Sequence, residues 1–136
     1  MYSELANNAA EHSESPVGCF GLIMYQESGP KRRIVCAVAD GGIGIRESLS
    51  HDPSHKQKAQ RDWSAIHHAT KERVSGTGDP YRGIGLSGID ADMTQIGREV
   101  VIHSGKGIFH MNSNLERHIS QTRLFPGTLG VVSVPV

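Results

Sequence analysis

The sequence predicts an α+β protein, an α/β two-layer sandwich in which helices cover one face of a mixed, mostly antiparallel sheet. Strand-like runs follow one another directly at residues 17–26 and 32–39. Trp63 and Ile66 recur at helical spacing within a predicted helix at residues 62–73. Further strand-like runs close the chain. Because strands follow strands, we expect hairpins rather than the crossover helices of a parallel sheet.

Each element has its own local signal. Ser3 is a good N-cap, and residues 3–11 are mostly helix formers, so a helix is predicted there. Residues 34–39 are uniformly apolar, which is typical of a buried strand. The other predicted elements are a helix at residues 86–96 and strands at 98–104, 107–112, 117–124 and 127–136.

Length and composition indicate one compact domain that spans residues 1–136. Fourteen basic and fourteen acidic residues cancel, so charge gives no reason to expect binding to nucleic acid or to an anionic membrane. No apolar run approaches the roughly 20 residues of a membrane span, and the first residues do not look like a secretion signal. A cytoplasmic location is the prediction.

The first predicted helix carries Glu4 and Asn8 one turn apart, on the same face. The amide oxygen of Asn8 suits Mg²⁺, which takes its other ligands from phosphates and water. A carboxylate at Glu4 is placed to accept a proton from an attacking hydroxyl or water. The alternative is a solvated helix end without chemistry.

A second motif follows the buried strand, where Asp40 precedes a group of three glycines, Gly41, Gly42 and Gly44. The carboxylate can accept a hydrogen bond from an exocyclic amine such as that of adenine, worth on the order of 1.5–3 kcal/mol. Glycines let backbone approach a ligand closely. An ordinary Asp-Gly turn is the alternative, although three glycines exceed what such a turn requires.

A third, glycine-rich motif contains Arg82, Gly83 and Gly85 and runs into the helix predicted at residues 86–96. Glycine-rich chain entering a helix N-terminus offers free N–H groups and a partial positive charge, which bind phosphate. A flexible loop before a helix is the alternative.

These three motifs, in this order, resemble the N box and the two glycine boxes of the GHKL ATPase superfamily. This superfamily includes gyrase, a heat-shock chaperone ATPase, histidine kinases and a mismatch-repair ATPase. The segment from Phe125 through Gly127 and Thr128 is similar to the closing strand of the same domain. The resemblance covers Glu4 to Pro135, and Glu at the start of the N box is similar to the anti-sigma-factor serine kinases.

The resemblance implies the Bergerat fold and a Mg-ATP site. Asn8 would hold Mg²⁺, Glu4 would act as base or orient the nucleophile, and Asp40 would bind the adenine amine beside Gly42 and Gly44. Residues 46–82 would form the lid. The remaining roles fall on Arg82 as a cation for the terminal phosphate, Gly83 and Gly85 as phosphate contacts, and Thr128 near the adenine.

The activity that the resemblance implies is a protein kinase of the anti-sigma type, which phosphorylates serine on a small antagonist protein. Two alternatives remain: a non-catalytic nucleotide-binding module that controls a partner such as a sigma factor, and the detached catalytic domain of a sensor histidine kinase. Domains of this family usually begin with a strand and helix before the N box, so the sequence resembles a member truncated at its N-terminus. The exposed apolar surface that truncation would leave favours instability or self-association, with a homodimer as one form.

Two other motifs carry less weight. His51 and His55 have the spacing of a helical zinc pair, but Pro53 lies between them and no convincing third ligand is evident. Residues 104–107, Ser-Gly-Lys-Gly, lack the spacing of a phosphate-binding P-loop and are predicted to form a hairpin turn.

Overall fold

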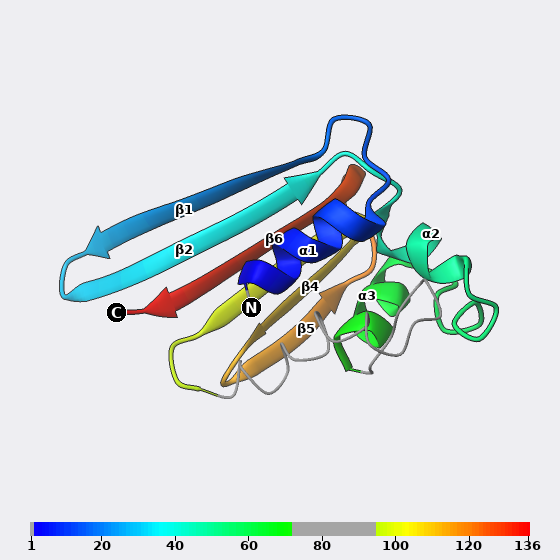
Figure 1. Cartoon of the computed structure of the whole chain (residues 1–136). Helices are drawn as coiled ribbons and strands as arrows, with labels where there is room; N and C mark the ends of the chain where they lie inside the picture. Colours follow the sequence, from blue (N-terminus) through cyan, green and yellow to red (C-terminus); the bar gives the residue numbers. More distant parts are fainter. Residues whose placement is uncertain (1, 72–94) are drawn as a thin grey trace.

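The computed structural model describes residues 2–71 and 95–136, which form an α+β fold with a six-stranded sheet (Figure 1). The strand order is β1-β2-β6-β3-β4-β5, and every described pair is antiparallel. The elements are α1 (Tyr2–His12), β1 (Cys19–Ser28), β2 (Lys31–Asp40), α2 (Gly44–Ser50), α3 (Asp62–Lys71), β3 (Glu99–Gly105), β4 (Gly107–Asn112), β5 (Leu115–Ile119) and β6 (Phe125–Pro135).

The last strand, β6, lies between β2 and β3 and so brings distant segments together. In the register, Ala39 of β2 faces Leu129 of β6, and Ser104 of β3 faces Thr128. The end of β2, the end of β3 and the start of β6 therefore lie side by side at one end of the strands, where Asp40 and Thr128 lie.

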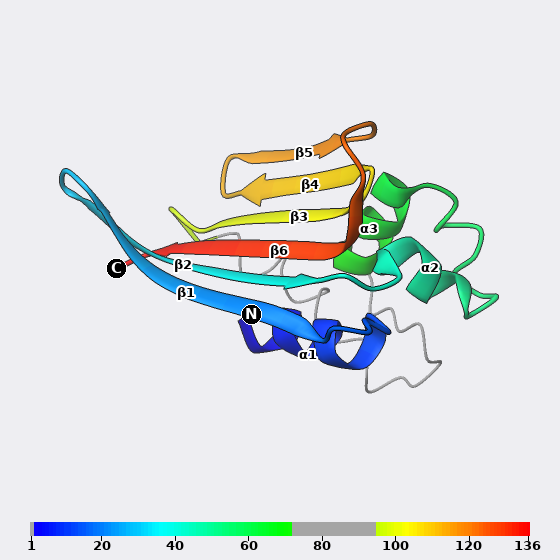
Figure 2. The same ribbon diagram turned by 90° about the horizontal axis from the view of Figure 1, so that it is seen from above.

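The helices pack on one face of the sheet. Leu5 and Ala9 of α1 and Ile66 of α3 belong to a single buried cluster that also contains Ile102 and Phe109 of the sheet. Because these strand residues alternate with residues that point the other way, α1 and α3 cover the same face. Figure 2 shows the strands in succession from β5 to β1, with α1 against the β1–β2 end.

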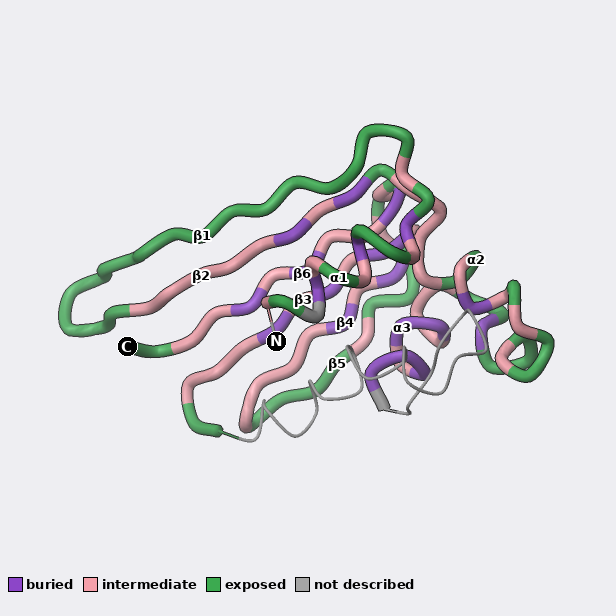
Figure 3. Tube along the Cα trace, viewed as in Figure 1, coloured by how far each residue is buried: buried purple, intermediate pink, exposed green. Residues whose placement is uncertain are grey.

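Strand β1 is exposed along its whole length, whereas its partner β2 becomes buried toward its end at Asp40 (Figure 3). It is an edge strand of the described sheet and pairs with β2 through all ten of its residues. Several of its exposed side chains are large and apolar: Phe20, Leu22, Ile23, Met24 and Tyr25.

Most predicted elements are confirmed, with bounds that shift by a few residues, and β4 matches its prediction at both ends. The helix α2 was not predicted, since Ile43 at its N-cap makes no capping bond with its side chain. The predicted helix at 86–96 falls outside the described residues except for residues 95 and 96, which are not helical. None of the described helices combines the length and the hydropathy that a bilayer crossing requires.

Candidate functional site

Asp40 is the last residue of β2, and it is buried, with only 6% of its surface exposed. The backbone N–H groups of Gly42 and Thr128 donate to its Oδ1, at 2.9 Å and 3.2 Å. Burial raises the pKa of this carboxyl above its ordinary value, and the two N–H donors partly oppose that rise. Both of its hydrogen bonds within the described residues go to Oδ1, which leaves the acceptor capacity of Oδ2 unused there.

The hydroxyl of Ser104 joins the second motif to the closing strand. The backbone N–H of Ile45 donates to Ser104 Oγ at 2.9 Å, and this hydroxyl donates to the carbonyl of Gly127 at 3.1 Å. Its Oγ also lies 3.2 Å from Thr128 Oγ1. Since the one proton of Ser104 goes to Gly127, the Thr128 hydroxyl is the donor in that pair.

Two glycines allow the backbone to close around Asp40. A Cβ at Gly42 would overlap the carbonyl of Ser13, the residue after α1, and that carbonyl also accepts from the Ile43 N–H at 2.7 Å. Gly127 has a φ of 94°, and a Cβ there would overlap the Asp40 carbonyl. The end of α1, the turn after β2 and the start of β6 are therefore in direct contact.

A pocket of about 900 Å³ opens beside these turns. Gly42, Gly44, Ser104 and Gly127 all line it, whereas Asp40 stands behind the wall that two of these glycines form. Charged side chains of both signs also face it: Arg46, Glu47, Lys56 and Asp62. The volume suits a small-molecule ligand of nucleotide size.

Asn8 lies on the flank of α1 that faces away from β1. Leu5 and Ala9 point into the core, and Tyr2 contacts β1 at Gly21. Because successive helical residues turn by about 100°, Asn8 and Tyr2 lie on opposite flanks of the Leu5 direction. Asn8 Nδ2 is buried and has no hydrogen-bond partner within the described residues. Because buried donors are usually satisfied, this N–H₂ group is a candidate contact for a ligand.

Four of the residues singled out from the sequence lie close together. Asp40 bonds to Gly42 and Thr128, and Gly44 lies beside Gly127 and Ser104. Asn8 lies in α1, and it is Ser13, the residue after that helix, that contacts Gly42. Glu4 lies in α1, one turn before Asn8. Arg82, Gly83 and Gly85 lie outside the described residues, so their predicted roles stay predictions.

Sequence reasoning missed the role of Ser104, which was assigned to a hairpin turn. The turn itself is confirmed, because Ser104 faces Gly107 across β3 and β4. The sequence had singled out Gly127 and Thr128. That Ser104 lies opposite Thr128 could not be known without the order of the strands.

Comparisons with known proteins add no relative. No family profile matches the sequence, and no curated protein matches it significantly. The function must therefore be inferred from the residues and their geometry.

Proposed function

We propose that the chain is a Mg-ATP-binding domain of the GHKL type, with the Bergerat fold, and that it acts as a protein kinase of the anti-sigma-factor serine kinase type. The observation that carries the proposal is the environment of Asp40. Its carboxylate is buried at the end of a strand, fixed through Oδ1 by two backbone donors and able to accept through Oδ2.

A purine amine is the ligand group that matches this acceptor. The exocyclic N–H of adenine would donate to Oδ2, while the backbone of Gly42 and Thr128 holds the carboxylate through Oδ1. A buried acceptor discriminates strongly, because a base that lacks the donor would leave Oδ2 without a partner. Guanine presents a carbonyl at the corresponding ring position, so we expect preference for adenine.

The amide of Asn8 fits the magnesium role that the N-box resemblance gives it. Its oxygen is the type of ligand that a hard divalent cation accepts, and its buried N–H₂ group would suit a phosphate oxygen. Along the α1 axis, Asn8 is about 7.5 Å from Ser13, which touches Gly42. An extended nucleotide can bridge that separation. When bound, Mg²⁺ would neutralise charge on the phosphates.

The remaining roles rest on sequence. Glu4 would accept the proton of the attacking serine hydroxyl, while Arg82, Gly83 and Gly85 would contact the phosphates from the lid at residues 46–82. The acceptor protein would be a small antagonist, and a sigma factor would be the partner that the chain controls. A cytoplasmic location, where ATP is available, belongs to the same proposal.

Transfer of radiolabelled phosphate tests the kinase assignment. The wild-type chain is incubated with labelled ATP, Mg²⁺ and candidate antagonist proteins, and Glu4→Ala is the comparison. We expect label on the acceptor with wild type and a loss of about 10²–10⁴-fold in rate with the variant. Nucleotide binding without any transfer would favour the regulatory module. Transfer at the wild-type rate by Glu4→Ala would remove the base assignment.

A further inference from the structure

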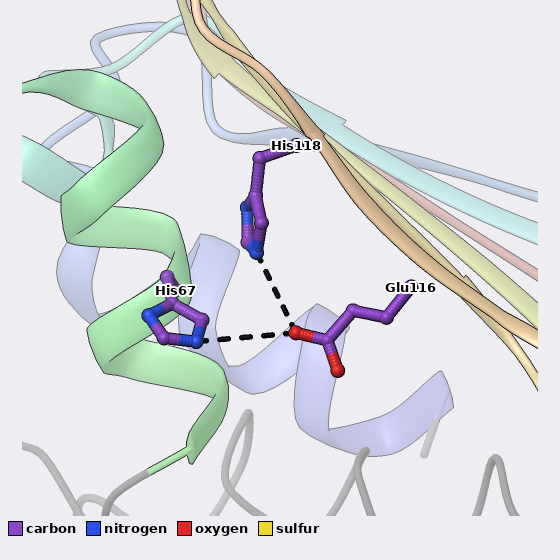
Figure 4. Close-up of side chains that lie close together, drawn as sticks. All are labelled: His67, Glu116 and His118. Carbon is purple, nitrogen blue, oxygen red and sulfur yellow. Dashed lines mark ion pairs between the residues drawn. The ribbon is translucent and has the colours of Figure 1, made fainter.

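Three metal-ligating side chains converge between α3 and β5, away from the residues assigned to the nucleotide (Figure 4). His67 comes from α3. Glu116 and His118 are two positions apart on β5, so they share one face of the strand, and both point toward the helix. One ligand atom from each of the three lies within 4.8 Å of the other two. None of these residues was part of the zinc pair considered from the sequence.

The separations leave room for an atom between the groups. Glu116 Oε1 lies 3.5 Å from His118 Nε2 and 3.9 Å from His67 Nε2. Both distances exceed the 2.7–3.2 Å of a direct N–H···O hydrogen bond. In a tetrahedral zinc site with Zn–N bonds of about 2.0–2.1 Å, neighbouring ligand atoms are about 3.4 Å apart. A small inward movement of the side chains would bring this group to that geometry.

Aromatic packing fixes the ring of His118. Its centroid lies 5.1 Å from that of the fully buried Phe109 and 5.9 Å from that of Trp63. The ring of His67 meets it edge-on at 4.9 Å. Side chains held in this way lose little conformational entropy when a metal binds. The side chains of His67 and Glu116 are partly exposed, at 46% and 33%, so an ion can reach the site from solvent.

We propose that His67, Glu116 and His118 form a site for a zinc-type divalent cation that fastens α3 to β5. Two imidazoles and one carboxylate make up the ligand set of an open zinc centre, whose fourth position is taken by water or by an added ligand. Each donor binds in its deprotonated form, as neutral imidazole or as carboxylate. Magnesium is disfavoured because it prefers oxygen ligands and octahedral geometry.

The site would also influence the large pocket. Helix α3 begins at Asp62, which lines that pocket and accepts a hydrogen bond of 2.9 Å from the Lys106 N–H. His67 is on the same helix, so a metal that holds His67 against β5 holds one wall of the pocket.

Titration of the full chain with Zn²⁺ and with Co²⁺ tests the proposal. Trp63 is the only tryptophan, and its contact with His118 makes its fluorescence a local reporter. We expect saturable binding with one ion per chain, visible d–d bands for Co²⁺ in a low-coordinate site, and a higher melting temperature with Zn²⁺. The comparison variants are His118→Ala and the milder Glu116→Gln, which should weaken binding at least about tenfold.

His51→Ala is the matched control. This histidine also faces a carboxylate, Glu47, at 4.0 Å, but no third ligand joins the pair among the residues that the structure describes. Its loss should leave zinc affinity unchanged. The proposal is overturned if wild type shows no saturable binding, or if Glu116→Gln, folded by circular dichroism, binds Zn²⁺ as tightly as wild type does. Equal weakening by His51→Ala would show that the ion is held elsewhere.

Discussion

The backbone N–H of Thr128 donates a hydrogen bond of 3.2 Å to Oδ1 of Asp40, although the two residues are 88 positions apart in the chain. This bond joins the end of β2 to the start of β6. It orients the buried carboxylate and brings the Thr128 hydroxyl to the same site, where it contacts Ser104.

Burial of Asp40 should lower stability at neutral pH. Because its folded-state pKa is raised, its contribution to stability is fully present below its unfolded value and is lost as pH rises through the folded value. Asp40→Asn, which keeps an oxygen for Gly42 and Thr128, should therefore be at least as stable as wild type at neutral pH. The gain is the free energy that the buried, ionised carboxyl costs the wild-type protein. Urea unfolding at several pH values measures it.

The gain should shrink as the pH is lowered and should be lost below the unfolded-state pKa of about 3.9, where the wild-type carboxyl is protonated in both states. Asp40→Ala is the control, since it removes the acceptor for two backbone N–H groups and should cost about 1–3 kcal/mol. The raised folded-state pKa of Asp40 would be contradicted if the Asn variant were less stable than wild type at neutral pH and this deficit vanished in acid.

Gly42 should not tolerate a side chain. A methyl group there would meet the Ser13 carbonyl, so Gly42→Ala should lower the free energy of unfolding by about 1–3 kcal/mol. Gly41→Ala is the matched control, because a Cβ at Gly41 makes only ordinary contacts, at 3.8 Å with Val17 and 3.9 Å with Ser15. Equal effects of the two substitutions in thermal melts would show that the turn and the end of α1 are not packed as described.

Ser104 should contribute to the stability of the fold. Ser104→Ala leaves the part-buried Ile45 N–H without its acceptor and the Gly127 carbonyl without its buried donor, which should cost about 1–3 kcal/mol. The exposed Ser120→Ala serves as the control in the same unfolding experiment. If Ser104→Ala matched this control, the hydroxyl would not be the junction between α2 and β6.

Strand β1 should cause the isolated chain to self-associate. Leu22 is 56% exposed on an edge strand of the described sheet, and exposed apolar edges pair with other chains. Light scattering should show mass that rises with protein concentration, and Leu22→Lys should reduce it. Gln26→Lys adds the same charge on the same face of β1 but removes no apolar group, so it should do less. A wild-type chain that stays monomeric with a cooperative melt at high temperature would contradict this expectation.

The sequence predicted the elements better than their ends. Strand β4 was placed correctly because glycine and asparagine bound its apolar run. Helix α2 was missed because it is short, begins at Gly44 with a φ of 78° and has no side-chain cap. It is stabilised by tertiary contacts, with Leu49 packed against Ala65 and Ala69 of α3.

The candidate site residues could be named from the sequence where a local motif contains them. Asp40, Gly42 and Gly44 lie within five consecutive positions, and Thr128 was suggested by the resemblance. Ser104 was missed because its partner Ile45 is 59 residues away. The group of His67, Glu116 and His118 was missed for the same reason, since only the fold brings β5 to α3.

The most direct test of the nucleotide assignment is titration with a fluorescent ATP analogue, with and without Mg²⁺, on wild type, Asp40→Asn and Asn8→Ala. Wild type should bind, more tightly with Mg²⁺. Asp40→Asn should lose about tenfold or more in affinity in both conditions, as expected for a charged hydrogen bond. Asn8→Ala should lose mainly the increase in affinity that Mg²⁺ gives to the wild-type protein. Equal binding by wild type and folded Asp40→Asn, or no binding by wild type, would contradict the assignment.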